Sequence, residues 1–411
     1  MNTSSTEIKE KIVMRNFLSE RINNLAESET LAMANLSREL KAKGHDVISL
    51  SLGEPDFNTP DIIKEAAKKA IDDNYTYYTP VSGYLDLRQA ICDKLKRENN
   101  LIYEPSQIVV SNGAKQSIAN AVMALVNPGE EVIIPAPYWV SYKEIIKLAE
   151  AKPVYIAATI ENDFKVTPQQ IEKAITSKTK LIIFSTPCNP TGSAYNKMEL
   201  MAIAEMLEKY PQVFVISDEV YEHINFVGAH ESIAQFDNIK ERVITINGVS
   251  KGYAMTGWRI GYMAAHKDIA KACDKLQGQI TSAPSSIAQR AALQALKCNK
   301  SEIQSMVETF RKRRDLVLDL LKDVPHIKTN IPQGAFYVFF DVSYYYGKSD
   351  GLTTVKDGSD LCMYILNKVH VAMVPGSAFG DENCIRFSYA TSENLLIEAV
   401  RRIKNALAEL K

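Results

Sequence analysis

Long apolar runs and paired cysteines are the features that this 411-residue sequence lacks most clearly. No uninterrupted apolar stretch reaches the 18 or more residues that span a bilayer, so we expect no membrane-spanning segment. The first 25 residues carry acidic side chains and no apolar block, so we also expect no signal peptide. The six cysteines form no CxxC pair and no zinc-type spacing with histidine, which predicts reduced thiols, no metal site and a cytoplasmic protein.

An excess of charge of one sign is also missing. The chain has 48 Lys+Arg against 49 Asp+Glu and a net charge of -1, so no basic field favours nucleic acid or an anionic membrane as a partner. The contents of 46% hydrophobic and 24% charged residues are ordinary for a globular protein with a sizeable core. The length suggests roughly two or three domains.

Short β-rich runs alternate with amphipathic or alanine-rich segments through the middle of the chain. Strands are predicted at Gln107–Ser111, Glu131–Pro135, Pro153–Ile156, Lys180–Ser185, Gln212–Ser217, Arg242–Asn247 and Arg259–Ala264. Helices are predicted between them at Lys115–Val126, Trp139–Glu150 and Lys197–Lys209. This alternation is typical of an α/β fold with a mostly parallel sheet that helices cover on both faces.

After Ala283 the pattern changes to longer helices and fewer strands. The predicted elements are helices at Ser285–Lys297, Ser301–Lys322 and Glu393–Leu410, a strand pair at Ala335–Asp341 and Ala372–Val374, and a strand at Ile385–Ser388. One helix, Leu31–Lys43, precedes the first strand. We therefore predict a large α/β domain at 51–300 and a smaller α+β domain that both chain ends build, 1–50 and 301–411.

Two predicted strands end in turns that suit a ligand, and ligands of open parallel sheets bind at the carboxyl edge. The run IVVSNGAKQS places Gly113 in a turn and Ala114 and Lys115 at a helix N-terminus, where free N–H groups attract an anion such as phosphate. In LIIFSTPCNPTG two prolines stiffen the loop around Asn189 and would fix its amide as a donor. A structural turn in which Asn189 bonds its own backbone is the alternative.

Two further strand ends carry ionisable groups. Asp218 follows an apolar strand in VFVISDEVYEHI, with Tyr221 one turn later, so its carboxylate needs a cation or a donor unless it simply caps a helix. Lys251 follows Ser250 at another strand end, although most lysines are plain surface groups. Arg259, within WRIGY, is more specific, because a guanidinium held among apolar residues needs a planar anion and phosphate fits best.

Together these groups match one ligand, pyridoxal phosphate. The assignments are phosphate to the helix N-terminus and Arg259, ring nitrogen to Asp218, ring oxygen to Asn189 and Tyr221, aldehyde to Lys251, and ring face to Trp139 of the PYWVSY run. Few other cofactors need all of these groups at once. The combination therefore predicts a pyridoxal-phosphate enzyme, although each motif alone is weak.

The sequence resembles the class I aminotransferases of the aspartate aminotransferase family, bacterial-type subgroup, which have the fold-type I pyridoxal-phosphate architecture. Nearly the whole chain carries the resemblance, through SLGEPDFNTP, YTPVSGYLDLRQAI, PYWVSY, GVSKGYAMTGWRIG, VPGSAFG and IRFSYATS. It implies that Lys251 is the catalytic Schiff-base lysine and that Arg386 and Gly53 bind the substrate α-carboxylate. It also implies a homodimer with shared active sites, in which Tyr78 reaches the phosphate of the neighbouring cofactor.

Lys115 is the basis for predicting the substrate. Animal-type relatives bind the distal carboxylate of aspartate through a partner Arg, but the matching stretch ITSAPSSIAQ has none. Lys115 resembles the lysine that replaces it in the bacterial subgroup, which predicts transamination between aspartate and 2-oxoglutarate, with Trp139 and Asn189 also beside the substrate. The alternative role of Lys115 is to neutralise the cofactor phosphate.

Other activities are possible on this scaffold, because fold and cofactor do not determine the reaction. An alanine or aromatic aminotransferase and a β-lyase are the alternatives within enzymes. Relatives that accept prephenate usually have a basic residue in the loop before the first helix; Ala26, Glu27 and Glu29 stand in this loop and predict no such activity. A transcription regulator with this fold would carry a DNA-binding module ahead of Gly53, where we expect no room for one.

Overall fold

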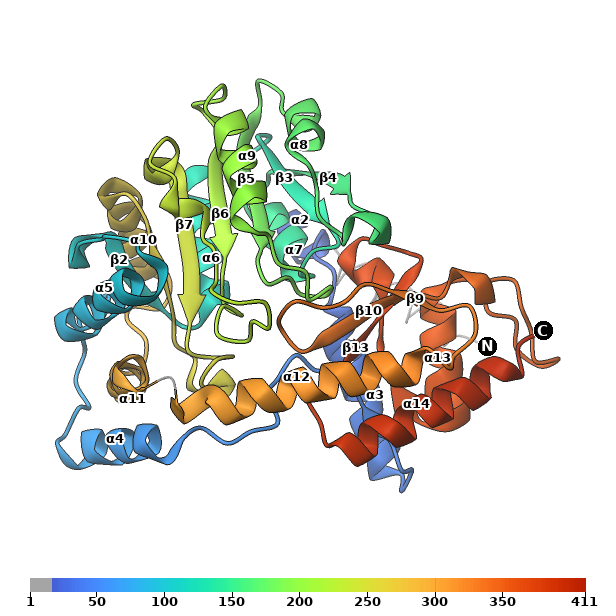
Figure 1. Ribbon diagram of the computed structural model, residues 1–411. Helices are drawn as coiled ribbons and strands as arrows, with labels where there is room; N and C mark the ends of the chain where they lie inside the picture. Colours follow the sequence, from blue (N-terminus) through green and yellow to red (C-terminus); the bar gives the residue numbers. More distant parts are fainter. Residues whose placement is uncertain (1–16, 300) are drawn as a thin grey trace, which may run out of the picture.

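A seven-stranded sheet is the central element of the computed structural model, which describes residues 17–299 and 301–411 (Figure 1). Its strands, in spatial order, are β2 (Ile108–Ser111), β8 (Gly261–Ala264), β7 (Val243–Gly248), β6 (Phe214–Asp218), β5 (Thr179–Ser185), β3 (Glu131–Ala136) and β4 (Lys152–Ala157). Strand β8 runs antiparallel to both of its neighbours, β2 and β7, and all other neighbouring pairs in this sheet are parallel. The seven strands predicted from the sequence and the mostly parallel sheet are therefore confirmed.

Helices cover both faces of this sheet, and the strand residues alternate between the faces. Ile133 packs into one apolar cluster, whereas Val132 and Ile134 pack into the other, as the two-residue period of a strand requires. The helices on the Val132 face are α6 (Ala114–Leu125), α7 (Ser141–Leu148) and α10 (Lys267–Ile280); those on the Ile133 face are α5 (Leu85–Asn99) and α9 (Lys197–Leu207). The strands are apolar on both faces because helices exclude water from both.

Local signals in the sequence set several helix ends. Thr167 and Gln170 form a capping box at the start of α8 (Pro168–Ala174), and Asn196 and Glu199 form another at the start of α9. The helix predicted at Trp139–Glu150 begins only at Ser141, so Trp139 lies ahead of the helix. This placement leaves the indole free to line the cavity described below.

A second, antiparallel sheet is built from the C-terminal part of the chain. Its strands, in spatial order, are β12 (Val374–Pro375), β13 (Cys384–Ser388), β10 (Tyr337–Asp341) and β9 (Lys328–Thr329). The predicted pairing of Ala335–Asp341 with Ala372–Val374 is wrong, because β13 lies between β10 and β12 and pairs with both. Ala372 and Val374 also belong to different sheets.

The N-terminal and C-terminal segments meet beside this second sheet. Strand β1 (Ile48–Ser49) pairs in parallel with β11 (Val371–Ala372), which brings two segments together that are distant in the sequence. The surrounding helices are α3 (Glu29–Ala42), α13 (Gly358–Val369) and α14 (Glu393–Ala408), whereas α2 (Glu20–Asn23) packs against α7 of the large sheet. Figure 1 shows α12 (Ser301–Leu321) running from the side of α11 (Ser286–Lys297) to this part, where it packs on α14. Helix α4 (Asp61–Asp72) packs against α11.

Within residues 17–299 and 301–411, none of the helices combines the length and the apolarity that crossing a bilayer requires.

Candidate active site

A cavity of about 270 Å³ lies at the carboxyl ends of β5, β6 and β7, next to the start of α6. The residues predicted for the site that line it are Gly53, Ala114, Lys115, Trp139, Asn189, Asp218, Tyr221, Ser250, Lys251, Arg259 and Arg386. Residues of both sheets thus contribute to the lining of the same cavity. Of the predicted site residues, Gly113 and Tyr78 are the two outside this lining.

Arg259 lines one end of the cavity, and Gly113 lies directly against its guanidinium. Gly113 has a φ of +83° and precedes α6, whose N-terminus has no side-chain cap. A Cβ atom on Gly113 would collide with the Arg259 guanidinium, so glycine is required for this close approach. Arg259 donates hydrogen bonds to the backbone oxygens of Asn112 (3.2 Å) and Thr256 (2.8 Å), which orient it beside the helix N-terminus. A guanidinium and free helix amides together make a site for an anion such as phosphate.

Lys251 lies in the turn after β7, and its amine is held by the backbone oxygen of Gly53. Burial is the main reason that the pKa of this amine is lowered to about 8. The positive charges of Arg386 and Arg259 also lower the pKa, whereas the carboxylate of Glu54 raises it. Near physiological pH a minority of Lys251 is therefore neutral, but this fraction is far larger than for an ordinary lysine. A neutral amine can add to a carbonyl group or accept a proton.

Asp218 ends β6 and is buried beneath the cavity. The hydroxyl of Tyr142 donates to its Oδ2 atom at 2.7 Å, and the backbone N–H of Val220 donates to Oδ1 at 3.3 Å. Burial raises the pKa of Asp218 to about 6, although both donors stabilise the carboxylate. A cation placed in the cavity would offset this cost of desolvation, so Asp218 is suited to pair with a protonated ring nitrogen.

Arg386 on β13 is a buried cation with room for an anion. Its guanidinium donates to Asn189 Oδ1 at 2.9 Å and to the backbone oxygen of Ser51, and it is only 1% exposed. Its Nε has no partner among the residues that the structure describes. The rings of Tyr337 and Phe379 lie 4.6 and 4.8 Å from the guanidinium carbon. An unneutralised buried charge is costly, so the cavity favours a ligand carboxylate at this end.

Lys115 lies on α6 with its amine 5.0 Å from the centre of the Trp139 ring. Burial lowers the pKa of Lys115, and the nearby charge of Arg259 lowers it further. The amine therefore has both the aromatic wall and the phosphate-type end of the cavity beside it. Both roles predicted for Lys115 agree with this position.

Tyr78 is the one predicted site residue that the fold places away from the cavity. It follows α4 and is fully exposed, next to Tyr77, which is 80% exposed. Within one chain, Tyr78 has no part in the site.

Several residues that line the cavity were not among those predicted from the sequence motifs. Tyr142 lies three residues after Trp139 in the same PYWVSY run, a spacing that places it one helical turn away, so this run held a usable signal. Tyr337 is in an apolar strand and looked like a core residue. The others are Ser28, Thr30, Leu31, Leu52, Val140, Ser141, Ser185, Val220 and Thr256.

Comparison with known proteins agrees with this geometry. Residues 45–403 match the family model described as aminotransferase class I and II. The chain belongs to this family. Among curated relatives it is 47% identical over 397 residues to "Aspartate/prephenate aminotransferase" from Cereibacter sphaeroides, covering 96% of this chain and 99% of the relative. It is 48% identical over 399 residues to "Bifunctional aspartate aminotransferase and glutamate/aspartate-prephenate aminotransferase" from Petunia hybrida, covering 96% and 83%.

Solved structures extend the agreement to the whole aminotransferase fold. The aspartate aminotransferase from Rhizobium meliloti superposes with a TM-score of 0.93 at 42% identity, over 96% of this chain and 99% of that one. The enzyme from Thermus thermophilus with maleate gives a TM-score of 0.88 at 37% identity, over 95% and 99%. The predicted membership in the aspartate aminotransferase family and the fold-type I architecture are confirmed.

The raised pKa of Asp218 predicts how the free aminotransferase responds to pH. A carboxyl group with a pKa of about 6 in the folded state and 3.8 in the unfolded state stabilises the fold below pH 3.8 and loses that contribution as the pH rises through 6. Asp218→Asn removes this dependence. Relative to the wild type, the variant should gain about 2.4 kcal/mol of unfolding free energy between pH 4 and pH 8, measured by urea titration without cofactor. Asp319→Asn, at an exposed position, is the control. An equal gain in unfolding free energy in this control would contradict a raised pKa at Asp218.

The lowered pKa of Lys251 predicts a reactive amine. Reductive methylation with formaldehyde, followed by peptide mass spectrometry, should label Lys251 with a pH midpoint near 8, because only the neutral amine reacts. The exposed Lys209, whose pKa is raised by its bond to Glu172, should be labelled only at higher pH. Equal midpoints for the two lysines would show that burial does not activate Lys251.

Proposed function

We propose that this aminotransferase binds pyridoxal phosphate and exchanges amino groups between aspartate and 2-oxoglutarate. The observation that carries the proposal is a single cavity that contains the activated amine of Lys251, the buried carboxyl of Asp218 and the unneutralised guanidinium of Arg386. Aminotransferases of this family depend on pyridoxal phosphate in general. The printed names of the relatives include aspartate aminotransferase.

The donors and acceptors around the cavity fit the groups of this cofactor. The α6 N-terminus at Gly113 and Ala114, with Ser250 and Arg259, would hold the phosphate. Asp218 would hold the ring nitrogen. The remaining assignments are Asn189 and Tyr221 to the ring oxygen and Trp139 to the ring face. When bound, the cofactor supplies an aldehyde for the amino group and a ring that withdraws electrons from the substrate α-carbon.

The side chains of the chain itself bind, orient and move protons. Arg386 offers two parallel donors to the α-carboxylate that every amino acid carries, and the Gly53 backbone lies beside it. Lys251, with a pKa of about 8, can accept the α-proton and return it as a general base and acid. Asp218 in its charged form keeps the ring nitrogen protonated. Burial of all three groups strengthens these interactions because little water competes.

Specificity for an acidic substrate rests on Lys115, whose amine faces the cavity beside Trp139. A second cation apart from Arg386 suits the distal carboxylate of aspartate or glutamate. Alanine or aromatic transamination and β-lyase chemistry on the same residues are the alternative activities. The full proposal also includes a large domain at 51–300, a small domain at 1–50 and 301–411, a homodimer and a cytoplasmic location; residues 1–16 and 300 lie outside the described part.

Half-reactions with single amino acids test this proposal, because each substrate converts the aldehyde form of the cofactor to its amine form with a change of absorbance. Aspartate and glutamate should be the best donors. Lys115→Ala should lower kcat/KM for aspartate about 10-fold to 100-fold more than for alanine, since a lost charge-assisted contact is worth roughly 1.5–3 kcal/mol. An equal loss for both substrates would assign Lys115 to the phosphate instead. A wild-type protein that stays colourless with pyridoxal phosphate would refute the proposal.

Prephenate is a second candidate substrate, because the names of several relatives include it. Glu27 and Glu29 make the entry loop acidic, and the Ala26 N–H donates to Glu144 Oε2 at 3.0 Å rather than facing a ligand. The expected lack of prephenate activity stays a prediction. The same half-reaction assay tests this when it is run from the amine form of the cofactor. We expect 2-oxoglutarate, but not prephenate, to restore the absorbance of the aldehyde form.

A shared-site homodimer predicts complementation between two inactive variants. Lys251→Ala damages a subunit's own site, whereas Tyr78→Asp would damage the neighbouring site. In a mixed dimer both changes fall in one site, so random pairing should recover about a quarter of wild-type activity. Lys251→Ala with Asp218→Ala should recover none, because both changes affect the subunit's own site. Recovery in both mixtures, or in neither although mixed dimers form, would exclude shared sites.

A further inference from the structure

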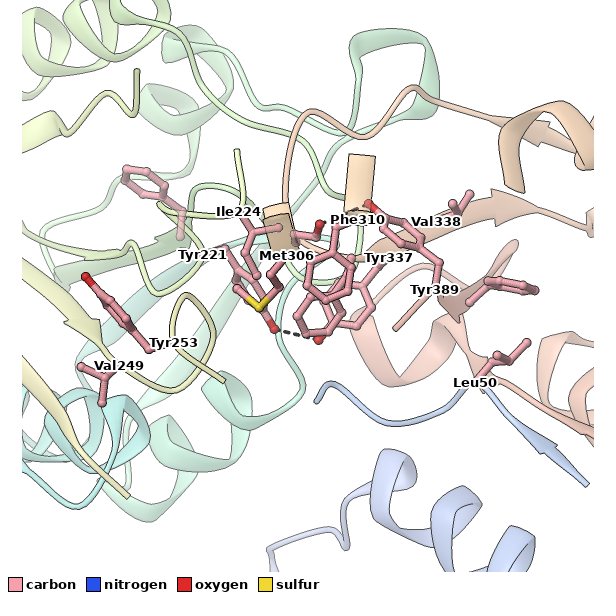
Figure 2. Packing of buried hydrophobic residues seen from close by; sticks show 14 of the residues in the cluster. Leu50, Tyr221, Ile224, Val249, Tyr253, Met306, Phe310, Tyr337, Val338 and Tyr389 are labelled. Carbon is pink, nitrogen blue, oxygen red and sulfur yellow. Dashed lines mark hydrogen bonds between the residues drawn. The ribbon is translucent and has the colours of Figure 1, made fainter. Parts of the chain in front are cut away.

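Tyr337 connects two parts of the candidate active site, the phenol of Tyr221 and the guanidinium of Arg386. It lies on β10, is fully buried, and lines the cavity. Its hydroxyl is 2.7 Å from the hydroxyl of Tyr221, and Figure 2 shows this bond between the two facing phenols. Its ring lies 4.6 Å from the guanidinium carbon of Arg386. One side chain therefore touches both the group that would bind the ring oxygen and the group that would bind the substrate carboxylate.

The chain leaves space for the Tyr337 hydroxyl. A Cβ atom on Gly53 would fall on this oxygen, so glycine at this position lets the phenol reach Tyr221. The backbone oxygen of Gly53 in turn holds the Lys251 amine. Any change in the position of Tyr337 would therefore also affect the backbone on which Lys251 rests.

The direction of the bond between the two phenols follows from counting protons. Each hydroxyl has one proton, and a Tyr221 that donates to the ring oxygen can only accept from Tyr337. Burial raises the pKa of both phenols, and the positive charge of Arg386 counteracts the rise at both. A donor to the Tyr221 oxygen also strengthens the bond that Tyr221 donates onward.

We propose that Tyr337 is a positioning residue that fixes Tyr221 as a donor to the cofactor ring oxygen and supports the guanidinium of Arg386 with its ring. The inference rests on the proposed function and adds a residue to it. The hydroxyl bonds Tyr221, and the ring packs beside Arg386. Tyr337→Phe removes only the hydroxyl, whereas Tyr337→Leu removes the hydroxyl and the aromatic ring.

The test measures the bound pyridoxal phosphate by absorbance as a function of pH, without substrate. When its donor is weaker, the ring oxygen keeps more negative charge. It then holds the proton on the adjacent Lys251 nitrogen more tightly. The pH midpoint of the absorbance change should therefore rise by about half a unit in Tyr337→Phe, and by more in Tyr221→Phe. Tyr389→Phe is the matched control, because Tyr389 is equally buried nearby but donates to the Ala335 backbone, outside the cavity.

Maleate binding, followed by the same absorbance, separates the two tasks. The dissociation constant should stay within about twofold in Tyr337→Phe and increase about fivefold or more in Tyr337→Leu, which lacks the ring beside Arg386. A Tyr337→Phe midpoint equal to that of the wild type and Tyr389→Phe would overturn the inference while leaving the proposed function intact. A wild-type protein without cofactor absorbance would overturn both. If Tyr337→Leu fails to fold, the midpoint of Tyr337→Phe decides alone.

Discussion

The buried guanidinium of Arg386 is the constraint on which the arrangement of this aminotransferase depends. A strand of the second sheet carries it, the backbone of Ser51 binds it from the N-terminal side, and Asn189 binds it from a loop of the large sheet. Three segments far apart in the sequence thus converge on one cation. Because no carboxylate of the described chain neutralises Arg386, they enclose a cavity with a defined charge rather than an apolar core.

Burial then gives two neighbouring groups opposite shifts. It raises the pKa of Asp218 to about 6 and lowers that of Lys251 to about 8, so both move toward neutral pH. In the free protein this costs stability, because each group is charged less readily than in water. The same cost makes the site selective for a ligand that brings the complementary charges. Function and reduced stability have one physical origin here, as is common at catalytic sites.

Apolar clusters support the part of the cavity that the large sheet provides. Lys251, Asp218 and Asn189 follow strands that apolar clusters hold on both faces. Arg386 comes from the second sheet, and Ser28 and Thr30 reach the cavity from the N-terminal segment. The large sheet therefore provides Lys251, Asp218 and Asn189, while the second sheet and the N-terminal segment provide the opposite lining of the cavity. Tyr337 and Gly53 lie where these parts meet.

Much of this architecture was accessible from the sequence. Periodicity alone located the seven strands of the large sheet, because apolar runs that end in glycine, proline or asparagine are local signals. The chemistry at four strand ends predicted a cofactor class, since parallel strands must present their carboxyl ends at one edge. Whole-chain resemblance was needed for Arg386 and Gly53, whose neighbours in the sequence carry no distinctive chemistry.

Only the tertiary structure decided the rest. The pairing of β10 with β13 rather than β12 depends on which edges remain free after the chain folds, and periodicity carries no such information. Tyr337 reads as a core residue until its hydroxyl is seen against Tyr221, and Tyr142 reads as a helix residue until it meets Asp218. The sequence by itself determined the strands, the ionisable groups and the family. Which buried polar atoms satisfy one another was decided by contacts between segments more than 70 residues apart, such as Tyr142 with Asp218 and Asn189 with Arg386.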